Sequence, residues 1–195
     1  MLFLVRRIVH DPSSAYAGQR KKGVELAVFI DVVGDQEFVW TGTNDPCFVA
    51  VIGSRRRDED SDRGQVLRAA VAVLEREVGL RPVVFVSGGC RKGADRHIEL
   101  FVEAANLVLV RFLPRDVPEG LPHWIRTRAL HDRNTRIVTL AGEVLAQVAP
   151  DRTGGTEDAV KKAHRLGRTV TLLNGDDTHT VEHPPVSKRR SCVVK

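Results

Sequence analysis

Short apolar runs alternate with longer amphipathic stretches over residues 48–174, and this alternation dominates the chain. FVAVIG at 48–53 and VVFVSG at 83–88 are apolar almost throughout, which is typical of strands buried on both faces of a sheet. Between them, residues 64–78 repeat apolar positions at helical spacing. Buried strands that alternate with amphipathic helices predict a Rossmann-like α/β fold, an open and mainly parallel sheet with helices on both faces. We expect further strands at 106–113, 144–150 and 169–174 and further helices at 94–105, 123–140 and 156–167.

The two ends of the chain follow other patterns. β-rich segments at 2–9, 24–33 and 36–41 predict a small antiparallel extension without a functional motif. The last residues have few apolar side chains, two adjacent prolines and the basic run SKRR, which predicts a flexible tail. We therefore expect an N-terminal β extension (1–47), a Rossmann-like domain (48–174) and a basic tail (175–195).

Charge and cysteine content narrow the range of partners. The net charge of +5 and the pI near 9.4 favour acidic partners such as nucleotides or nucleic acid, although part of the excess lies in the SKRR tail. The three cysteines are far apart and form no CxxC or His/Cys pattern, so we expect no metal site. MLFLVRRIV is too short to span a membrane and lacks the features of a signal peptide. These features predict a cytoplasmic protein that does not bind a membrane.

The residues after the first strand of the alternating region offer groups for an anion. Ligands of open α/β sheets bind beyond the carboxyl ends of the strands. Gly53, Ser54 and Arg55 follow this strand, and a hydroxyl and a guanidinium can both bind phosphate. We expect residues 56–60 to form a solvated loop whose charges cancel.

The second strand runs into the glycine-rich turn SGGCRKGAD, residues 87–95. Such a turn can present backbone N–H groups to an anion, and the positive end of the following helix adds to the attraction. The alternative is a plain glycine-rich turn, but three glycines and two cations between a strand and a helix favour a phosphate site. The turn contributes Ser87, Gly88, Gly89, Arg91, Lys92, Gly93 and Asp95 as candidate ligand-binding residues.

Gly154, Gly155 and Thr156 form a third candidate, at the start of the last expected helix. Free N–H groups and a capping hydroxyl could bind a phosphate there without a charged side chain. The alternative is an ordinary helix start whose acids, Glu157 and Asp158, satisfy the helix dipole.

The long helix supplies the fourth candidate, Arg133 and Asn134. A cation and an amide next to each other could reach a bound ligand, and the alternative is that they belong to a solvent-exposed face.

The order GSR, SGG..(K/R)GAD, RN and GGT resembles the SLOG superfamily, and its small YspA-like branch most of all. This Rossmann-like group includes DprA, the LOG phosphoribohydrolases and many small nucleotide-sensing proteins, and the resemblance covers about residues 48–174. It implies a nucleotide-type ligand across the strand ends, with Gly53–Arg55 on one side and the 87–95 turn as the floor. Arg133 and Asn134 would reach in from the long helix, and Gly154–Thr156 would cap the phosphate. The resemblance also implies a possible homodimer.

The last motif departs from that of the LOG enzymes. Their pattern is similar to P-G-G-x-G-T-x-x-E, whereas Thr153 and Ala159 occupy the proline and glutamate positions here. We therefore expect a sensor or carrier of a phosphorylated, nucleotide-derived ligand, without a further cofactor. The main alternative is a LOG-like N-glycosidic hydrolase of nucleoside 5′-monophosphates that uses Arg133 with Glu157 or Asp158. Single-stranded DNA binding, as in DprA, and a molybdopterin carrier are further alternatives, and the aromatic content of 5% disfavours DNA.

Overall fold

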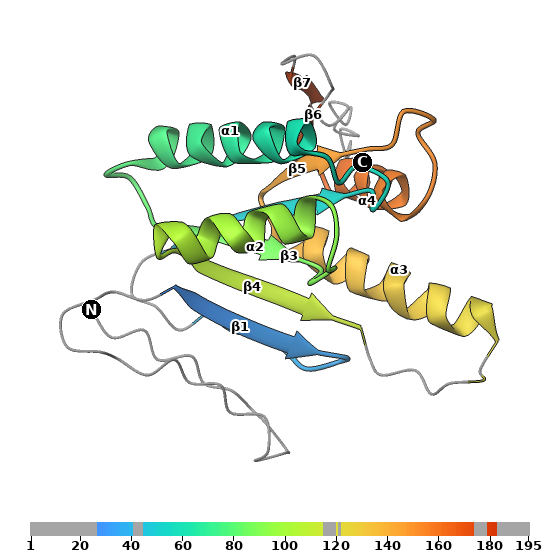
Figure 1. The fold of residues 1–195 in the computed structure, drawn as a ribbon. Helices are drawn as coiled ribbons and strands as arrows, with labels where there is room; N and C mark the ends of the chain where they lie inside the picture. Colours follow the sequence, from blue (N-terminus) through green and yellow to red (C-terminus); the bar gives the residue numbers. More distant parts are fainter. Residues whose placement is uncertain (1–26, 41–44, 115–119, 121, 174–178, 183–195) are drawn as a thin grey trace, which may run out of the picture.

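The structure is a computed structural model that describes residues 27–40, 45–114, 120, 122–173 and 179–182 (Figure 1). The strand expected at 2–9 and the SKRR run lie outside the described residues.

One sheet of seven strands forms the centre of the molecule, in the order β1-β4-β3-β2-β5-β6-β7. β1 to β6 are parallel and β7 is antiparallel to β6, so the predicted open, mainly parallel α/β sheet is confirmed. The chain moves outward from β2 through β3 to β4, then crosses to β5 on the other side of β2. The strands are β1 (Val28–Val33), β2 (Cys47–Gly53), β3 (Val83–Ser87), β4 (Val108–Leu113), β5 (Glu143–Gln147), β6 (Thr169–Leu173) and β7 (His179–Glu182).

Two helices cover each face of the sheet (Figure 1). Alternate strand residues point to opposite faces, so Val49 and Val51 pack with α1 and α2, whereas Ala50 and Ile52 pack with α3 and α4. Each face has its own apolar core, as the predicted pattern of doubly buried strands requires. The helices are α1 (Asp60–Glu77), α2 (Ala94–Ala105), α3 (His123–Leu140) and α4 (Gly155–Arg165).

The expected boundaries hold closely except at the start of α1 and at the end of β5, which stops at Gln147 rather than at 150. This helix begins at Asp60 rather than at 64, because Glu59 and Asp62 form a capping box that satisfies backbone N–H groups in the first turn. β4 begins at Val108 because Asn106, in the left-handed conformation with φ 53°, ends α2.

We expected the strand at 24–33 to belong to an antiparallel extension. Instead, the N-terminal strand joins the central sheet as a parallel strand. β1 lies parallel to β4 at the edge of the sheet, in a register that places Asp31 beside Arg111. Their side chains form a two-bond ion pair, with N–O distances of 2.6 and 2.8 Å. A periodic pattern predicts a strand but says nothing about the distant strand with which it pairs.

Two further differences concern the ends of the described chain. Residues 36–40 form no strand; instead Phe38 and Trp40 pack edge-on against Phe48, with ring centroids 6.0 and 5.8 Å apart. β7 belongs to the sheet, although we expected its residues to lie in the flexible tail.

Candidate ligand site at the carboxyl ends of the strands

The loop after β2 lies where the order of the sheet reverses, between β2 and β5. The backbone N–H of Ser54 donates to the carbonyl of Gln147, which joins the ends of these two strands (2.9 Å). Gly53 lies so close to the start of α2 that an added Cβ would be 2.5 Å from the Cβ of Ala94. The GSR motif therefore occupies the switch point at which open α/β sheets bind ligands.

The three arginines of this loop have different environments. Arg55 is exposed, whereas Arg56 forms a two-bond ion pair with Asp151 (2.8 and 2.9 Å) in the loop after β5. The hydrogen bonds from Arg56 hold the pKa of Asp151 at about 2, below its ordinary value. These two loops are thus joined across the switch point, above the ends of β2 and β5.

Arg57 contradicts our expectation that residues 56–60 form a solvated loop. Its side chain is 13% exposed, pairs with Asp62 at 2.7 Å and donates to the carbonyl oxygens of Val148 and Leu173. A buried guanidinium needs such partners, and here it ties α1 to the ends of β5 and β6. The local run of alternating charges could not reveal these distant acceptors.

The glycine-rich turn encloses a carboxylate of its own chain. Asp95 is buried, and its carboxylate accepts hydrogen bonds from the backbone N–H groups of Gly88 and Cys90. Burial raises the pKa of Asp95, while the nearby charge of Arg133 and the two N–H donors act in the opposite direction.

Two other N–H groups of the turn are also bonded to side chains. Gly89 donates to the hydroxyl of Ser87 at 3.2 Å, and Gly93 donates to the carboxylate of Asp58 at 2.8 Å. The sequence pattern suggested that the turn presents its N–H groups to a ligand. In the structure, several of them are already bonded to side chains of the protein. The two cations of the turn, Arg91 and Lys92, are exposed and remain available.

Arg133 and Asn134 connect the separate motifs. Arg133 donates to the carbonyl of Gly88 at 3.0 Å and, through two nitrogens, to the side-chain oxygen of Asn134. Asn134 is 7% exposed and donates to the carbonyl of Gly155 at 3.2 Å. The pair is therefore no solvent face, because it joins α3 to the glycine-rich turn and to the start of α4.

The start of α4 is an open helix N-terminus at the carboxyl ends of the strands. Its N-cap residue, Gly154, has φ 92° and supplies no side-chain cap. A Cβ added at Gly154 would meet no atom within 4 Å, while Thr156, two residues further along the chain, is buried. By contrast, the capping-box carboxylates of Glu59 and Asp62 already accept backbone N–H groups at the start of α1. The acids in the first turn of α4, Glu157 and Asp158, are instead paired with cations.

The two candidate catalytic carboxylates are held by cations. Glu157 pairs with Arg152 at 2.7 Å, and Asp158 pairs with Lys162 at 2.7 Å and with His131 Nδ1 at 2.9 Å. Burial raises the pKa of Asp158, but the hydrogen bonds and charges of Lys162 and His131 outweigh it and lower the pKa overall.

Our site prediction omitted several partners at the carboxyl ends, among them Asp58 and His131, as well as Arg56, Asp151, Arg152 and Lys162. His131 lies in the HDRN run, so its spacing from Asn134 on one helix could have indicated a position near the site. Asp58 offered no such signal, because its partner Gly93 is far along the chain. Ala159, at the position of the LOG glutamate, is fully buried in the core.

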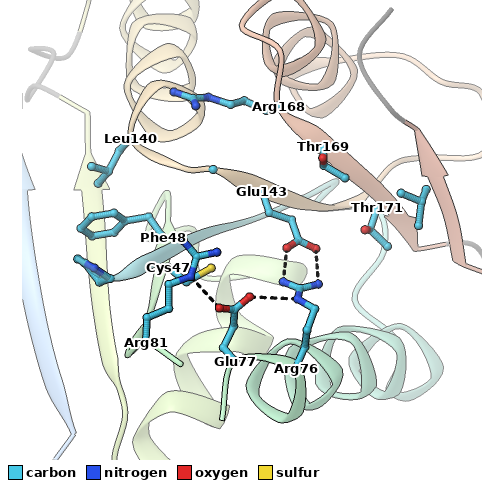
Figure 2. Close-up of a pocket in the computed structure, with 13 residues that line it drawn as sticks. Cys47, Phe48, Arg76, Glu77, Arg81, Leu140, Glu143, Arg168, Thr169 and Thr171 are labelled. Carbon is cyan, nitrogen blue, oxygen red and sulfur yellow. Dashed lines mark hydrogen bonds and ion pairs between the residues drawn. The ribbon is translucent and has the colours of Figure 1, made fainter. Parts of the chain in front are cut away.

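Two hollows open at opposite ends of the strands, one at the carboxyl ends and one at the amino ends. A hollow of about 400 Å³ lies between the start of α1 and the loop after β5. A larger cavity of about 610 Å³ lies at the amino ends of the strands (Figure 2), away from the glycine motifs. We assign the candidate ligand site to the carboxyl ends despite the smaller hollow, because the helix N-termini and the four sequence motifs meet there. The residues that line the smaller hollow are Arg56, Arg57, Glu59, Asp62, Val148, Ala149, Pro150 and Arg152.

No family model, curated protein or solved structure matches the chain in comparisons with known proteins. The resemblance to the SLOG superfamily therefore stays a prediction. Within the described residues, no helix is long and apolar enough to cross a membrane. The same part of the chain contains no group of three or more His, Cys, Asp or Glu side chains that could hold a metal ion.

Proposed function

We propose that this protein is a SLOG-like sensor or carrier that binds a phosphorylated, nucleotide-derived ligand across the carboxyl ends of β2, β3 and β5. The single observation that carries this proposal is the pair Arg133 and Asn134. These side chains bond the carbonyls of Gly88 and Gly155, and so hold the second and the last motif around one point of α3. Separate motifs that converge beyond the strand ends are what a shared ligand requires.

We place the phosphate group at the start of α4 rather than in the glycine-rich turn. Gly154 leaves open space there, and the backbone dipole of α4 favours an anion. The N–H groups of Gly88, Gly89 and Gly93 already have protein acceptors, so the turn serves as a rigid wall beside the ligand. Exposed Arg55, Arg91 and Lys92 add positive charge around it.

Hydrolysis of the ligand is the second candidate function, and one contact favours it. The carboxylate of Asp158 lies 2.9 Å from Nδ1 of His131, which orients the ring so that Nε2 could exchange a proton with water or with a leaving base. Glu157 and the buried Ala159 offer no comparable arrangement, because the first is paired with Arg152 and the second has no functional group.

The proposal is tested by titrating the purified protein with AMP in a calorimeter, after a thermal-shift screen of nucleoside mono- and diphosphates, NAD derivatives and cyclic nucleotides. Arg133→Gln should weaken binding by about tenfold or more, because it removes a charge-assisted donor at the point of convergence. Arg128→Gln is the matched control, since this arginine is on the same helix and its side chain is 76% exposed.

The outcomes separate the candidate functions. A compound that binds and is recovered intact supports a sensor or carrier, whereas release of free base supports hydrolysis. Binding that Arg133→Gln and Arg128→Gln weaken equally would contradict the proposed site. Affinity only for single-stranded DNA, falling steeply with salt, would replace the proposal with a DNA-binding function.

A further inference from the structure

The larger cavity lies at the opposite end of the sheet from the proposed nucleotide site. Its walls come from the amino ends of β2, β5 and β6, the end of α1 and the end of α3 (Figure 2). A volume of about 610 Å³ is within the usual range of small-molecule pockets. Helix N-termini do not point to this edge, so any ligand must be recognised by side chains.

One wall of the cavity presents guanidinium groups and hides the carboxylates that neutralise them. Glu77 is 6% exposed and Glu143 15%, whereas the side chains of Arg76 and Arg81 are 51% and 48% exposed. Arg76 donates hydrogen bonds to both carboxylates. Arg81 donates to Glu77 through Nε alone, at 2.7 Å, so within the described chain its two terminal nitrogens have no acceptor.

A second guanidinium with unused donors lies across the cavity, on Arg168 (Figure 2). One terminal nitrogen donates to the carbonyl of Thr139 at 2.9 Å. The other terminal nitrogen has no acceptor among the residues that the structure describes, so it can donate to a bound anion. The hydroxyls of Thr169 and Thr171 line the same space and add further donors.

The space between the two guanidiniums has an apolar side. Phe48 and Leu140 line it, and both also pack against the core on the α3 and α4 face. Three arginines face two carboxylates in this cavity, so its charge favours an anion. An anion that also has an apolar body would use both kinds of wall.

We infer that this amino-edge cavity is a second ligand site, which binds a small organic anion through Arg81 and Arg168 and its aromatic or branched aliphatic body through Phe48 and Leu140. The anionic group is a carboxylate or a phosphate, because the planar fork of a guanidinium matches the geometry of both groups. This site is independent of the proposed nucleotide site and of its function.

The two tryptophans allow each edge of the sheet to be observed separately. Trp40 packs on Phe48 in the wall of the cavity, whereas Trp124 is 63% exposed at the start of α3, near the other edge. In a Trp124→Phe protein, titration with benzoate and with phenyl phosphate should change the fluorescence of Trp40 saturably. Whichever of the two binds more tightly identifies the anionic group, and inorganic phosphate should bind more weakly than phenyl phosphate because it has no apolar body.

Substitutions that keep the charge but remove the planar fork test the role of the arginines. Arg81→Lys and Arg168→Lys should each weaken binding about tenfold, because lysine cannot form the paired hydrogen bonds of a guanidinium. Arg165→Lys is the control, since among the described residues this arginine donates only to the carbonyl of Lys161, one turn back on α4. Thr171→Val, which changes no charge and removes no member of the ion-pair network, should also weaken binding.

Absence of a saturable Trp40 response to both probes would overturn the inference. An equal effect of Arg165→Lys and Arg81→Lys would overturn it too. Retained response of Trp40 in an Arg133→Gln protein that no longer binds AMP would show that the two sites stand or fall separately.

Discussion

Asp95 does more than any glycine of the glycine-rich turn to hold that turn in shape. Its buried carboxylate receives the N–H groups of Gly88 and Cys90 and lies in the field of Arg133. The turn is thereby held in shape before any ligand arrives, which reduces the ordering that binding would otherwise require.

Replacing Asp95 by Asn should therefore destabilise the protein by about 1–3 kcal/mol, because the amide offers one acceptor atom and places a donor against backbone N–H groups. Urea unfolding measures the change in the free energy of unfolding. Asp132→Asn is the control, since the Asp132 side chain is 72% exposed on α3 and should alter stability little. Equal effects of the two substitutions would show that Asp95 does not organise the turn.

Gly89 is required for two reasons that a matched pair of substitutions separates. Its φ is 65°, and an added Cβ would lie 2.5 Å from Leu113 Cδ2. Gly79 has a similar φ of 75°, but an added Cβ there meets nothing within 4 Å. Both Ala variants should lose about 1–2 kcal/mol from backbone strain, and Gly89→Ala about 1 kcal/mol more from repacking of Leu113. Indistinguishable unfolding midpoints would contradict the crowding at Gly89.

His97 makes the stability of the fold depend on pH. It is 6% exposed, its Nε2 has no hydrogen-bond partner in the part of the chain that the structure describes, and Asp58 Oδ1 lies 3.9 Å away. Burial lowers the pKa of His97, and the charge of Asp58 only partly opposes this shift.

Below about pH 6.5 the unfolded chain therefore takes up a proton that the folded protein resists, so His97 lowers stability as the pH falls. Its contribution to the slope is at most about 1.4 kcal/mol per pH unit. His97→Gln should flatten the fall in unfolding free energy between about pH 7 and pH 5, whereas His123→Gln, at an exposed position, should not. An unchanged slope in the His97→Gln protein would mean that the imidazole is protonated as easily in the fold as outside it.

The residue types at the candidate site were predictable from the sequence, but their partners were not. GSR, the glycine turn, Arg133–Asn134 and GGT follow local rules of strand ends and helix starts, and all four lie at the carboxyl ends of the strands. The acceptors of the turn are set by tertiary contact, as between Gly93 and Asp58, which no local pattern encodes.

Among the elements, those of the central α/β region were predictable because their apolar spacing is strong and their ends carry capping or proline signals. The pairing of the outer strands of the sheet was not predictable. β1 pairs with β4, which is distant in sequence, and the register is set by contacts such as the Asp31–Arg111 pair and the stacking of Arg111 on Phe29, 5.2 Å from the ring centroid.

This ion pair predicts the behaviour of β1 as an element. Asp31→Asn should speed the hydrogen exchange of the amides of β1, because it weakens the link between β1 and β4 in the middle of the strand. The effect on global stability should stay within about 1 kcal/mol, since both side chains are partly exposed. Exchange in β6, on the other side of the sheet, is the internal control. Equal acceleration in β1 and β6 would show that β1 unfolds only with the whole molecule.

For the molecule as a whole, one sheet separates two edges with different chemistry. The carboxyl edge combines backbone groups, glycines and a helix N-terminus, whereas the amino edge combines guanidiniums with an apolar wall. The apolar cores on both faces of the sheet lie between the two edges, and no residue lines both hollows. Occupation of one site should therefore change the other little.

Independence of this kind has a thermodynamic signature. A ligand at about 100 times its dissociation constant stabilises the folded state by about 2.7 kcal/mol, and for a chain of this size each kcal/mol raises the Tm by about 2–4 °C. AMP and the preferred aromatic anion should each raise the Tm by several degrees, and together their stabilisation free energies should add to within about 0.5 kcal/mol. Scanning calorimetry with each ligand alone and with both measures this sum. At unchanged ligand concentrations, a tenfold loss of affinity cuts an increment from about 2.7 to about 1.4 kcal/mol. Arg133→Gln should reduce only the AMP increment in this way, and Arg81→Lys only that of the aromatic anion. A combined effect only about 0.4 kcal/mol above the greater single one is what mutually exclusive binding gives, and it would contradict two independent sites.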